Sequence, residues 1–434
     1  MRSVRIRDAK DLKALGGDLR TRTAPSPAEE RAVAAMLRSV AKGGDKALLS
    51  YARRFDGFKG GAKDLFVGPA EIKAAYGRVD KAFIKAVETV ISNVRAYQAR
   101  LKPKSWRAHL RGGVLLGQMV RPMRRVGLYV PGGEAPLVST VLMTAVPAAV
   151  AGVPEMVLAT PDRFGNGIDP RLLVAADLAG VKELLRVGGA HAIAALAYGT
   201  ASVQKVDKIV GPGNRWVSLA KKQVYGVCGI DMVAGPSEAL VLADDSAPAE
   251  WVAADLLSQA EHAGDETAIL VTTSARLAKA VLKSLKARLK VLPRRAAAES
   301  SLKRHGLVVV ARDMELAVEA ANLIAPEHLQ LMVRDAEAWL PKLKAAGAIF
   351  VGPYTPVALG DFLAGPSHVL PTGSTARFSS GLSVEDFVTK SSVIGYSRGA
   401  LETALPALEA IGNAEGLQAH VRSGQVRLPR TKGR

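Results

Sequence analysis

The sequence predicts an α/β protein with two Rossmann-like lobes, each a parallel sheet, plus an N-terminal helical arm and a C-terminal helical tail. Two series of short apolar segments alternate with longer helical ones, which is the pattern of β-α-β units in parallel sheets. At 434 residues the chain is too long for one ordinary hydrophobic core. A Gly-, Pro- and Ser-rich stretch over 352–395 follows the second series and separates it from a last helical segment.

The first hundred residues predict helices that follow a short arm. Ser26, Pro27 and Glu29 form a helix start, with Ser as the N-cap, Pro at the first helical position and Glu completing a capping box. The opening residues lack the apolar region of a secretory signal. No apolar run reaches the ~18 residues of a membrane span, so we expect a cytoplasmic protein with no membrane partner.

The first β-α series predicts strands that end in glycine-rich turns. The strand segments are 126–133, 156–160, 183–189 and 208–213, and the helical segments are 139–152, 171–180, 190–200 and 214–226. Backbone N–H groups at such turns can hold phosphates, although glycine also serves tight turns in general. The G-x-G-x-x-G dinucleotide fingerprint follows none of these strands.

The second series begins after a join near residues 229–238. Its predicted strands are 238–244, 267–273, 306–312, 329–335 and 348–353, again with helices between them. The stretch over 352–395 is longer than an ordinary linker, so we expect it to be functional. A final helical segment is expected over about 399–422.

The positive charge of the chain is concentrated in its first 125 residues. The net charge is +19, and residues 1–125 hold 28 Lys and Arg against 11 Asp and Glu. A basic lobe can mark a nucleic-acid surface, but these residues are scattered and aromatic residues make up only 5% of the chain. We therefore favour a solvated surface. The one cysteine, Cys228, excludes an intramolecular disulfide and is best interpreted as a small buried hydrophobe.

Four places combine titratable or amide side chains with breaks in regular structure. They are Gln259 with His262, Glu327 with His328, Asp361 with His368, and Glu415 with His420. Each has an ordinary explanation by itself: a histidine favoured at a helix C-terminus, a surface carboxylate, a turn cap, a solvated helix residue. Taken together, Gln259, His262, Asp361 and His420 make a nitrogen and oxygen donor set that suits Zn²⁺, Mn²⁺ or Co²⁺.

Several of these candidate residues lie directly before strands of the second predicted sheet. Ser237, the Gln259/His262 pair and the Glu327/His328 pair all precede strands of the second series, so we expect them at the amino-terminal edge of that sheet. Pro326 disfavours helix at Ala325, which ends the preceding helix near Ile324. The glycine-rich turns follow strands of the first series, so a cleft joining the two lobes edge to edge would bring both sets together.

Nine motifs then carry a family resemblance: VGLYVPGG, VGGAHAIAALAYGT, VGPGN, GIDMVAGPSEALVLAD, LLSQAEH, APEHLQL, IFVGPYTPVALGDF, SHVLPTGSTARFSSGLSVEDF and EGLQAH. Jointly they resemble the histidinol dehydrogenase family over about residues 30–428. The resemblance implies a homodimeric, zinc-dependent enzyme that oxidises L-histidinol through an aldehyde to L-histidine, with two NAD⁺ reduced in sequence.

The resemblance also implies roles for individual residues. The implied zinc ligands are Gln259, His262, Asp361 and His420, with the imidazole and amine of the substrate completing the sphere. His328 is the implied base for the alcohol proton, and Glu327 the implied base that activates water. Ser237, His368 and Glu415 match substrate-contacting positions, beside the ligands and bases already named. Tyr129, His191 and Asn214 match cofactor-contacting positions, and His191 stands where the family usually has Gln.

The expected division of the chain follows from both lines of reasoning. We expect an arm over 1–27, a catalytic domain from 28–125 and 238–380, an NAD-binding domain over 126–237, and a tail over 381–434 that reaches across a dimer. The alternatives are a related NAD- and zinc-dependent dehydrogenase of another polar alcohol, such as a sulfonated propanediol, and a metal-dependent hydrolase with Glu327 as base. A nucleic-acid-binding protein is the least favoured.

Overall fold

The computed structural model describes residues 1–19, 26–132, 135–162, 167–262 and 264–428. The chain divides into two compact units. The first comprises Met1–Leu101 and Met123–Phe387, and the second comprises Lys102–Pro122 and Val388–Arg434. None of the described helices is long and apolar enough to cross a membrane.

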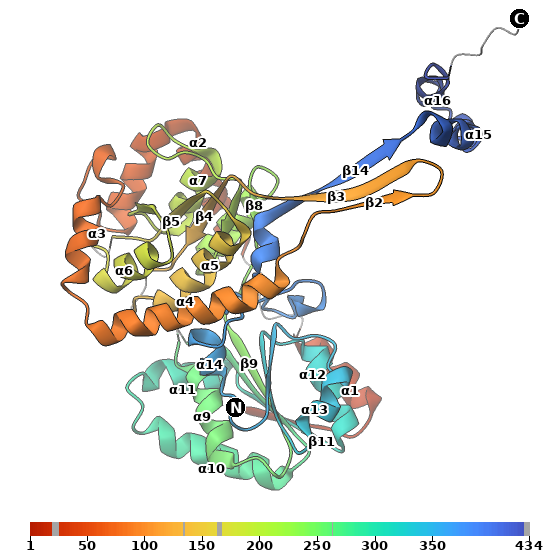
Figure 1. Ribbon diagram of the computed structural model, residues 1–434. Helices are drawn as coiled ribbons and strands as arrows, with labels where there is room; N and C mark the ends of the chain where they lie inside the picture. The colour runs from red at the N-terminus through yellow and green to blue at the C-terminus, as the bar shows by residue number, and fades with distance from the viewer. Residues whose placement is uncertain (20–25, 133–134, 163–166, 263, 429–434) are drawn as a thin grey trace, which may run out of the picture. The chain divides into compact units, whose positions relative to one another are not determined.

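The first unit contains a six-stranded sheet in which every neighbouring pair is parallel (Figure 1). In spatial order the strands are β1 (Arg2–Ile6), β11 (Leu307–Ala311), β10 (Thr267–Thr272), β9 (Glu238–Ala243), β12 (His328–Met332) and β13 (Ala348–Val351). Helices cover both faces, which explains why the inner strands read as continuous apolar runs. One face packs against α1 (Ala9–Leu19) and α12 (Met314–Ile324), and the other against α9 (Ala249–Ala260), α10 (Ala275–Leu289) and α11 (Arg295–Arg304).

The same unit contains a second parallel sheet, of five strands. Their order is β6 (Glu183–Leu185), β5 (Glu155–Ala159), β4 (Arg125–Tyr129), β7 (Lys208–Val210) and β8 (Gly229–Ile230). Because β4 is the first of these strands in the chain and lies between β5 and β7, the strand order reverses there. Nucleotides bind at such a reversal in doubly wound sheets.

Seven helices of the described residues pack around the five-stranded sheet. They are α2 (Pro27–Phe55), α3 (Pro69–Tyr76), α4 (Lys81–Leu101), α5 (Val138–Ala151), α6 (Pro170–Leu178), α7 (Gly189–Tyr198) and α8 (Arg215–Val224). Helix α2 packs against α7 and α8, α4 against α5 and α6, and α3 against α6. The predicted start of α2 is confirmed, since Ser26 and Glu29 form a reciprocal capping box and Pro27 is the first helical residue.

The second unit is built on an antiparallel sheet of β14 (Val388–Tyr396), β3 (Val114–Pro122) and β2 (Trp106–Leu110), in that order. Two helices follow β14, namely α15 (Arg398–Ala414) and α16 (Gln418–Gln425). The remaining described helices of the first unit are short: α13 (Ala336–Trp339), α14 (Val357–Phe362), and the 3₁₀ turns η1 (Ala62–Asp64), η3 (Leu340–Lys342), η4 (Thr375–Arg377) and η5 (Val384–Phe387).

The two parallel-sheet lobes and the helical tail confirm the predicted fold class, and three local features differ from expectation. The N-terminal segment is not only helical, because β1 pairs with β11 as an edge strand before α1 begins. The stretch over 352–395 ends in the long strand β14. Residues 28–125 were expected with 238–380, but α2 buries Val33, Leu37 and Val40 in the core of the five-stranded lobe.

Candidate functional site

The amino-terminal edge of the six-stranded sheet is where the candidate residues before β9, β10 and β12 were expected to meet. In register, Glu238 of β9 lies beside Thr267 of β10, and Ala239 lies beside His328 of β12. Ser237 directly precedes β9, and its carbonyl accepts a hydrogen bond from Thr267 N. The amino-terminal ends of these parallel strands therefore meet at one edge, as predicted.

Local sequence explains how Glu327 and His328 enter this edge. Helix α12 ends at Ile324, and Ala325 takes a left-handed conformation with φ 49°. Pro326 cannot continue the helix, so the chain turns directly into β12. His328 is the first residue of that strand rather than part of the preceding turn.

Glu327 and His328 are buried and bind the same backbone residue. Glu327 Oε2 accepts a 2.8 Å hydrogen bond from Glu238 N, and His328 Nδ1 lies 3.0 Å from Glu238 O. Because a carbonyl only accepts, Nδ1 carries a proton in this arrangement. The exposed fractions of Glu327 and His328 are 5% and 4%. His328 Nε2 makes no hydrogen bond within the described residues and faces Asp361 Oδ1 at 3.4 Å.

Burial and neighbouring charges shift the pKa values of the pair. Burial raises the pKa of Glu327 to about 7, although the adjacent His328 opposes this. Burial by itself lowers the pKa of His328, but the negative charges of Glu327 and Asp361 raise it to about 9. Titratable groups whose pKa values are shifted by burial and by each other's charges are typical of sites that carry out acid–base chemistry.

Asp361 belongs to the same cluster. It lies on α14, and its Oδ1 is 3.4 Å from His328 Nε2. Burial raises the pKa of Asp361, but the imidazoles of His328, His368 and His262 outweigh burial and hold that pKa below its ordinary value. His368 Nε2 contacts Ser139 Oγ at 3.2 Å, and burial lowers the pKa of this imidazole.

Gln259 and His262 are contributed by the end of α9. Gln259 lies in the last turn of the helix and is buried, with 2% of its surface exposed. His262 follows the helix, and its Nδ1 lies 3.1 Å from Gln259 O. The contact with Gln259 O holds the His262 ring against the last turn of α9, beside Gln259.

A metal ion was expected among these residues. Within the described parts of the chain, no group of three or more His, Cys, Asp or Glu side chains is close enough to hold one. His420 and Glu415 belong to the second unit, in α16 and at the C-cap of α15, and both are exposed. The other three residues of the expected set, Gln259, His262 and Asp361, belong to the first unit, and their side chains offer oxygen and nitrogen donors of the kind that suits zinc. These three donors fit a zinc site, which would need at least one further ligand to complete its coordination.

The expected cofactor residues lie at the carboxyl-terminal edge of the five-stranded sheet. Tyr129 ends β4, and its hydroxyl accepts a 2.9 Å hydrogen bond from Gly189 N. Asn214 is the N-cap of α8 and accepts hydrogen bonds from two backbone N–H groups. His191 is buried, and its Nε2 lies 2.9 Å from Asp56 Oδ2. Tyr129 and His191 therefore shape this edge through contacts inside the protein.

Three residues of the site lie outside the sequence prediction. Glu238 contributes its backbone N–H and C=O, so the type of its side chain does not indicate this role in the sequence. Asp56 anchors both His191 and Gly188 N from a position 135 residues before His191 in the chain. Ser139 meets His368 across 229 residues. Only tertiary contact could identify these partners.

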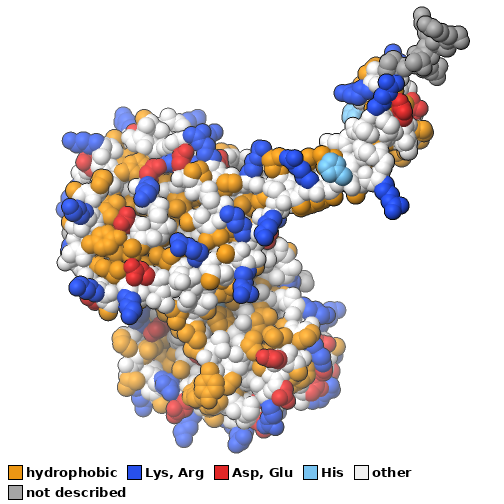
Figure 2. Space-filling view, viewed as in Figure 1, with side chains coloured by type: hydrophobic (Ala, Val, Ile, Leu, Met, Phe, Trp, Pro, Cys, Tyr) orange, Lys and Arg blue, Asp and Glu red, His pale blue; other side chains and the backbone are white. Residues whose placement is uncertain are grey.

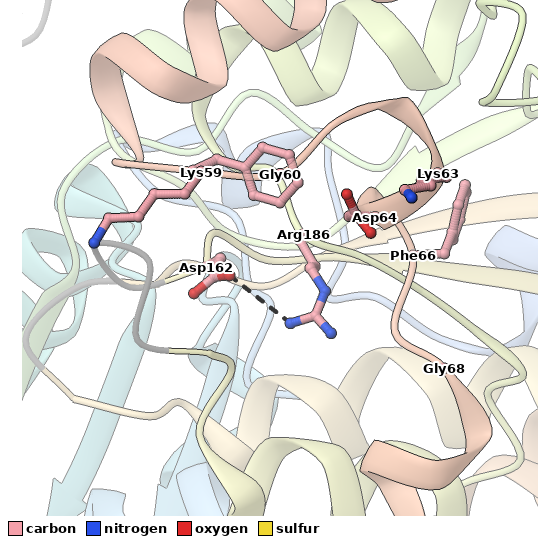
Figure 3. A pocket seen from close by; sticks show the side chains of 9 residues that line it. Lys59, Gly60, Lys63, Asp64, Phe66, Gly68, Asp162 and Arg186 are labelled. Atoms are coloured by element: carbon pink, nitrogen blue, oxygen red, sulfur yellow. Dashed lines mark ion pairs between the residues drawn. The ribbon is translucent and has the colours of Figure 1, made fainter.

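A separate pocket of about 420 Å³ lies beside the same lobe (Figure 3). Arg186, which follows β6, points across it toward Asp162 at 3.8 Å and pairs with Glu71. Lys59 and Lys63 line its rim. On the face shown in Figure 2, the Lys and Arg side chains of the first unit are scattered among apolar and acidic ones.

Comparisons with known proteins identify the family. The family model for histidinol dehydrogenase matches residues 20–428. A histidinol dehydrogenase from Bacillus anthracis is 48% identical over 399 residues, covering 92% of each chain. One from Syntrophotalea carbinolica is 47% identical and covers 99% of each chain. The crystal structure of histidinol dehydrogenase from Elizabethkingia anophelis superimposes with a TM-score of 0.94 at 34% identity, covering 100% of this chain and 99% of that one. The chain therefore belongs to the histidinol dehydrogenase family of oxidoreductases.

Proposed function

We propose that this protein oxidises L-histidinol to L-histidine through the aldehyde, reducing two NAD⁺ in sequence and using one zinc ion per subunit. The observation that carries the proposal is the buried Glu327–His328 pair, held on Glu238 and facing Asp361. It supplies a carboxylate and an imidazole for two different proton transfers. Family membership supports the substrate.

In the first half-reaction, His328 Nε2 takes the hydroxyl proton of the substrate while hydride leaves the carbinol carbon for NAD⁺. The Nδ1–H···O=C bond to Glu238 keeps the ring oriented and favours the neutral tautomer in which Nε2, facing Asp361, carries no proton. The products are the aldehyde, one NADH and one proton. A neutral His328 is required, so Asp361 and Glu327 decide the pH at which the base is available.

In the second half-reaction, water adds to the aldehyde and a second hydride leaves the hydrated carbon. Glu327 takes the proton of that water, which its pKa of about 7 allows near neutral pH. The hydrogen bond from Glu238 N holds one carboxylate oxygen in place. The products are the carboxylate, a second NADH and two protons, of which Glu327 accepts the first.

Gln259, His262, Asp361 and His420 are the proposed zinc ligands. When bound, zinc supplies a Lewis-acid centre that holds the amine and imidazole nitrogens of the substrate. Ser237, His368 and Glu415 are proposed to contact the substrate, and Tyr129, His191 and Asn214 the cofactor. We also propose a cytoplasmic homodimer in which the tail over 381–434 completes the site of the partner. The tail carries an exposed apolar surface that a partner would cover, with Ile394 71% and Ile411 64% exposed.

NADH formation from L-histidinol tests the proposal. The expected result is two NADH per histidinol, with activity lost in a chelator and in His328→Ala. A sulfonated propanediol serves as the competing substrate. NADH formed from the propanediol and not from histidinol would overturn the substrate assignment, and substrate consumed with no NADH formed would overturn the reaction.

A further inference from the structure

A buried ion pair lies beneath the glycine turn that follows β7. Lys221 of α8 and Asp231, one residue after β8, form the pair, and their side chains are 2% and 0% exposed. Buried ion pairs add little net stability compared with apolar residues of the same size. A structural role in folding alone is therefore a weak explanation for charges at this position.

Both members of the pair also bind one residue of the turn. Asp231 Oδ2 accepts a 2.7 Å hydrogen bond from Gly211 N, and Lys221 Nζ donates a 2.8 Å hydrogen bond to Gly211 O. Gly211 has φ +117°, and a Cβ there would lie 2.1 Å from Tyr129 O. The ion pair thus holds, from both sides, a glycine that presses against the end of β4.

The turn at Gly211 lies at the point of the sheet where a dinucleotide is expected to bind. Gly211 follows β7, and Tyr129 ends β4, so the two flank the point where the strand order reverses. Three residues beyond Gly211, Asn214 caps α8. A turn at such a reversal is where a doubly wound sheet receives a dinucleotide.

Asp231 also begins the segment that leads to the Glu327–His328 pair. Its Oδ1 accepts a 2.6 Å hydrogen bond from Met232 N. Farther along, Ala234 O accepts a 2.5 Å bond from Ser218 Oγ of α8, and Gly235 N donates a 2.5 Å bond to Thr372 Oγ1. The segment ends at Glu238, the residue that both Glu327 and His328 bind.

We infer that Lys221 and Asp231 are positioning residues, which hold the Gly211 turn in the geometry that receives the dinucleotide. Neither residue touches the reacting atoms. The inference rests on the proposed function for the identity of the dinucleotide, NAD⁺. Loss of the pair loosens the turn, so affinity for NAD⁺ falls while the histidinol site at the other sheet keeps its contacts. A misplacement of about 1 Å is enough to lower rates roughly a hundredfold in well-positioned sites.

The test uses three variants of the full-length protein: Lys221→Met, Asp231→Asn and the double variant. Each single variant leaves one uncompensated buried charge and is expected to lower the melting temperature. The double variant leaves none, so it recovers part of that loss. NAD⁺ affinity is measured without turnover, by titration calorimetry or by the fluorescence of Trp216, which is 41% exposed two residues after Asn214. All three variants should bind NAD⁺ roughly tenfold more weakly, and KM for histidinol should stay within about twofold of wild type.

Arg125→Met is the matched control. Arg125 is also buried and ion-paired, with Glu183, but it begins β4 at the opposite edge of the same sheet. The Arg125→Met variant should be less stable than wild type and should bind NAD⁺ with unchanged affinity. Unchanged NAD⁺ affinity in the double variant, or an equal loss in Arg125→Met, would overturn the inference. Wild-type protein that binds NAD⁺ but does not oxidise histidinol would refute the proposed function instead, and leave the positioning test intact.

Discussion

Glu327 and His328, adjacent in the chain, bind the N–H and the C=O of one residue, Glu238. The carboxylate and the imidazole are 3.6 Å apart and buried, so each strongly affects the charge of the other. Since β9 and β12 are neighbouring parallel strands, this arrangement is fixed by the sheet and not by a mobile loop. A rigid pair of proton-transfer groups makes the pH dependence of the reaction predictable.

The alcohol oxidation should speed up as pH rises through the pKa of His328, which the negative charge of Glu327 raises, and level off once the imidazole is neutral. The base must be neutral to take a proton, so the protonated form present below that pKa is inactive. Glu327→Gln removes a negative charge that raises the pKa, so the midpoint of the profile should move to lower pH. The profile of kcat/KM for histidinol measures both. A midpoint that stays in place or moves upward would contradict the assigned coupling.

Removal of zinc should abolish activity and leave most of the fold. The proposed ligands come from separate segments attached to large parallel sheets, whose cores do not depend on a metal. Small zinc domains, by contrast, unfold without metal. Circular dichroism and the NADH assay after chelation and dialysis measure the two properties, and added zinc should restore activity. Full activity in protein verified as metal-free would refute the assignment.

His191→Gln should retain most NAD⁺ affinity, because an amide nitrogen can replace Nε2 in the contact with Asp56. His191→Leu leaves the buried Asp56 carboxylate with the Gly188 N–H alone among its described partners, and should destabilise the protein by about 1–3 kcal/mol. The KM for NAD⁺ should rise in the Leu variant and not in the Gln variant, with KM for histidinol unchanged in both. A change confined to the histidinol KM would place His191 outside the cofactor region.

A homodimer with shared sites predicts complementation between His420→Ala and His328→Ala. In a mixed dimer one site takes its tail from the His328→Ala chain and its body from the His420→Ala chain, so it has both histidines. Random pairing makes about half of the dimers mixed, so activity should recover to roughly a quarter of wild type. Co-expression with two affinity tags isolates the mixed species. Mixed dimers as inactive as both parents would show that each tail serves its own subunit.

Cys228 should resist alkylation in the folded protein. The side chain is buried, and burial raises the pKa of the thiol to about 12, so only about one molecule in ten thousand carries a thiolate at pH 8. Mass spectrometry after iodoacetamide treatment should find the native protein unmodified and the denatured protein fully modified. Rapid labelling of the native protein would show that the segment around Cys228 opens.

The amino-acid sequence by itself determines the local features of this protein. Apolar runs and their spacing predict the strands of both parallel sheets other than β1 and β8, since a strand buried on both faces must be apolar throughout. Pro326 predicts the end of α12, and Ser26 with Glu29 predicts the start of α2. The placement of Ser237, Gln259 and Glu327 ahead of strands predicts their common sheet edge, because parallel strands align their amino-terminal ends.

Tertiary structure alone decides which distant residues meet. The antiparallel pairing of β14 with β3 joins segments that are hundreds of residues apart, so neither strand signals its partner. The same holds for Asp56 with His191, and for Lys221 and Asp231 around Gly211. Hydrogen bonds and ion pairs need only a donor, an acceptor and proximity. Residue type supplies the first two, and the packing of the two sheets and their helices supplies the third.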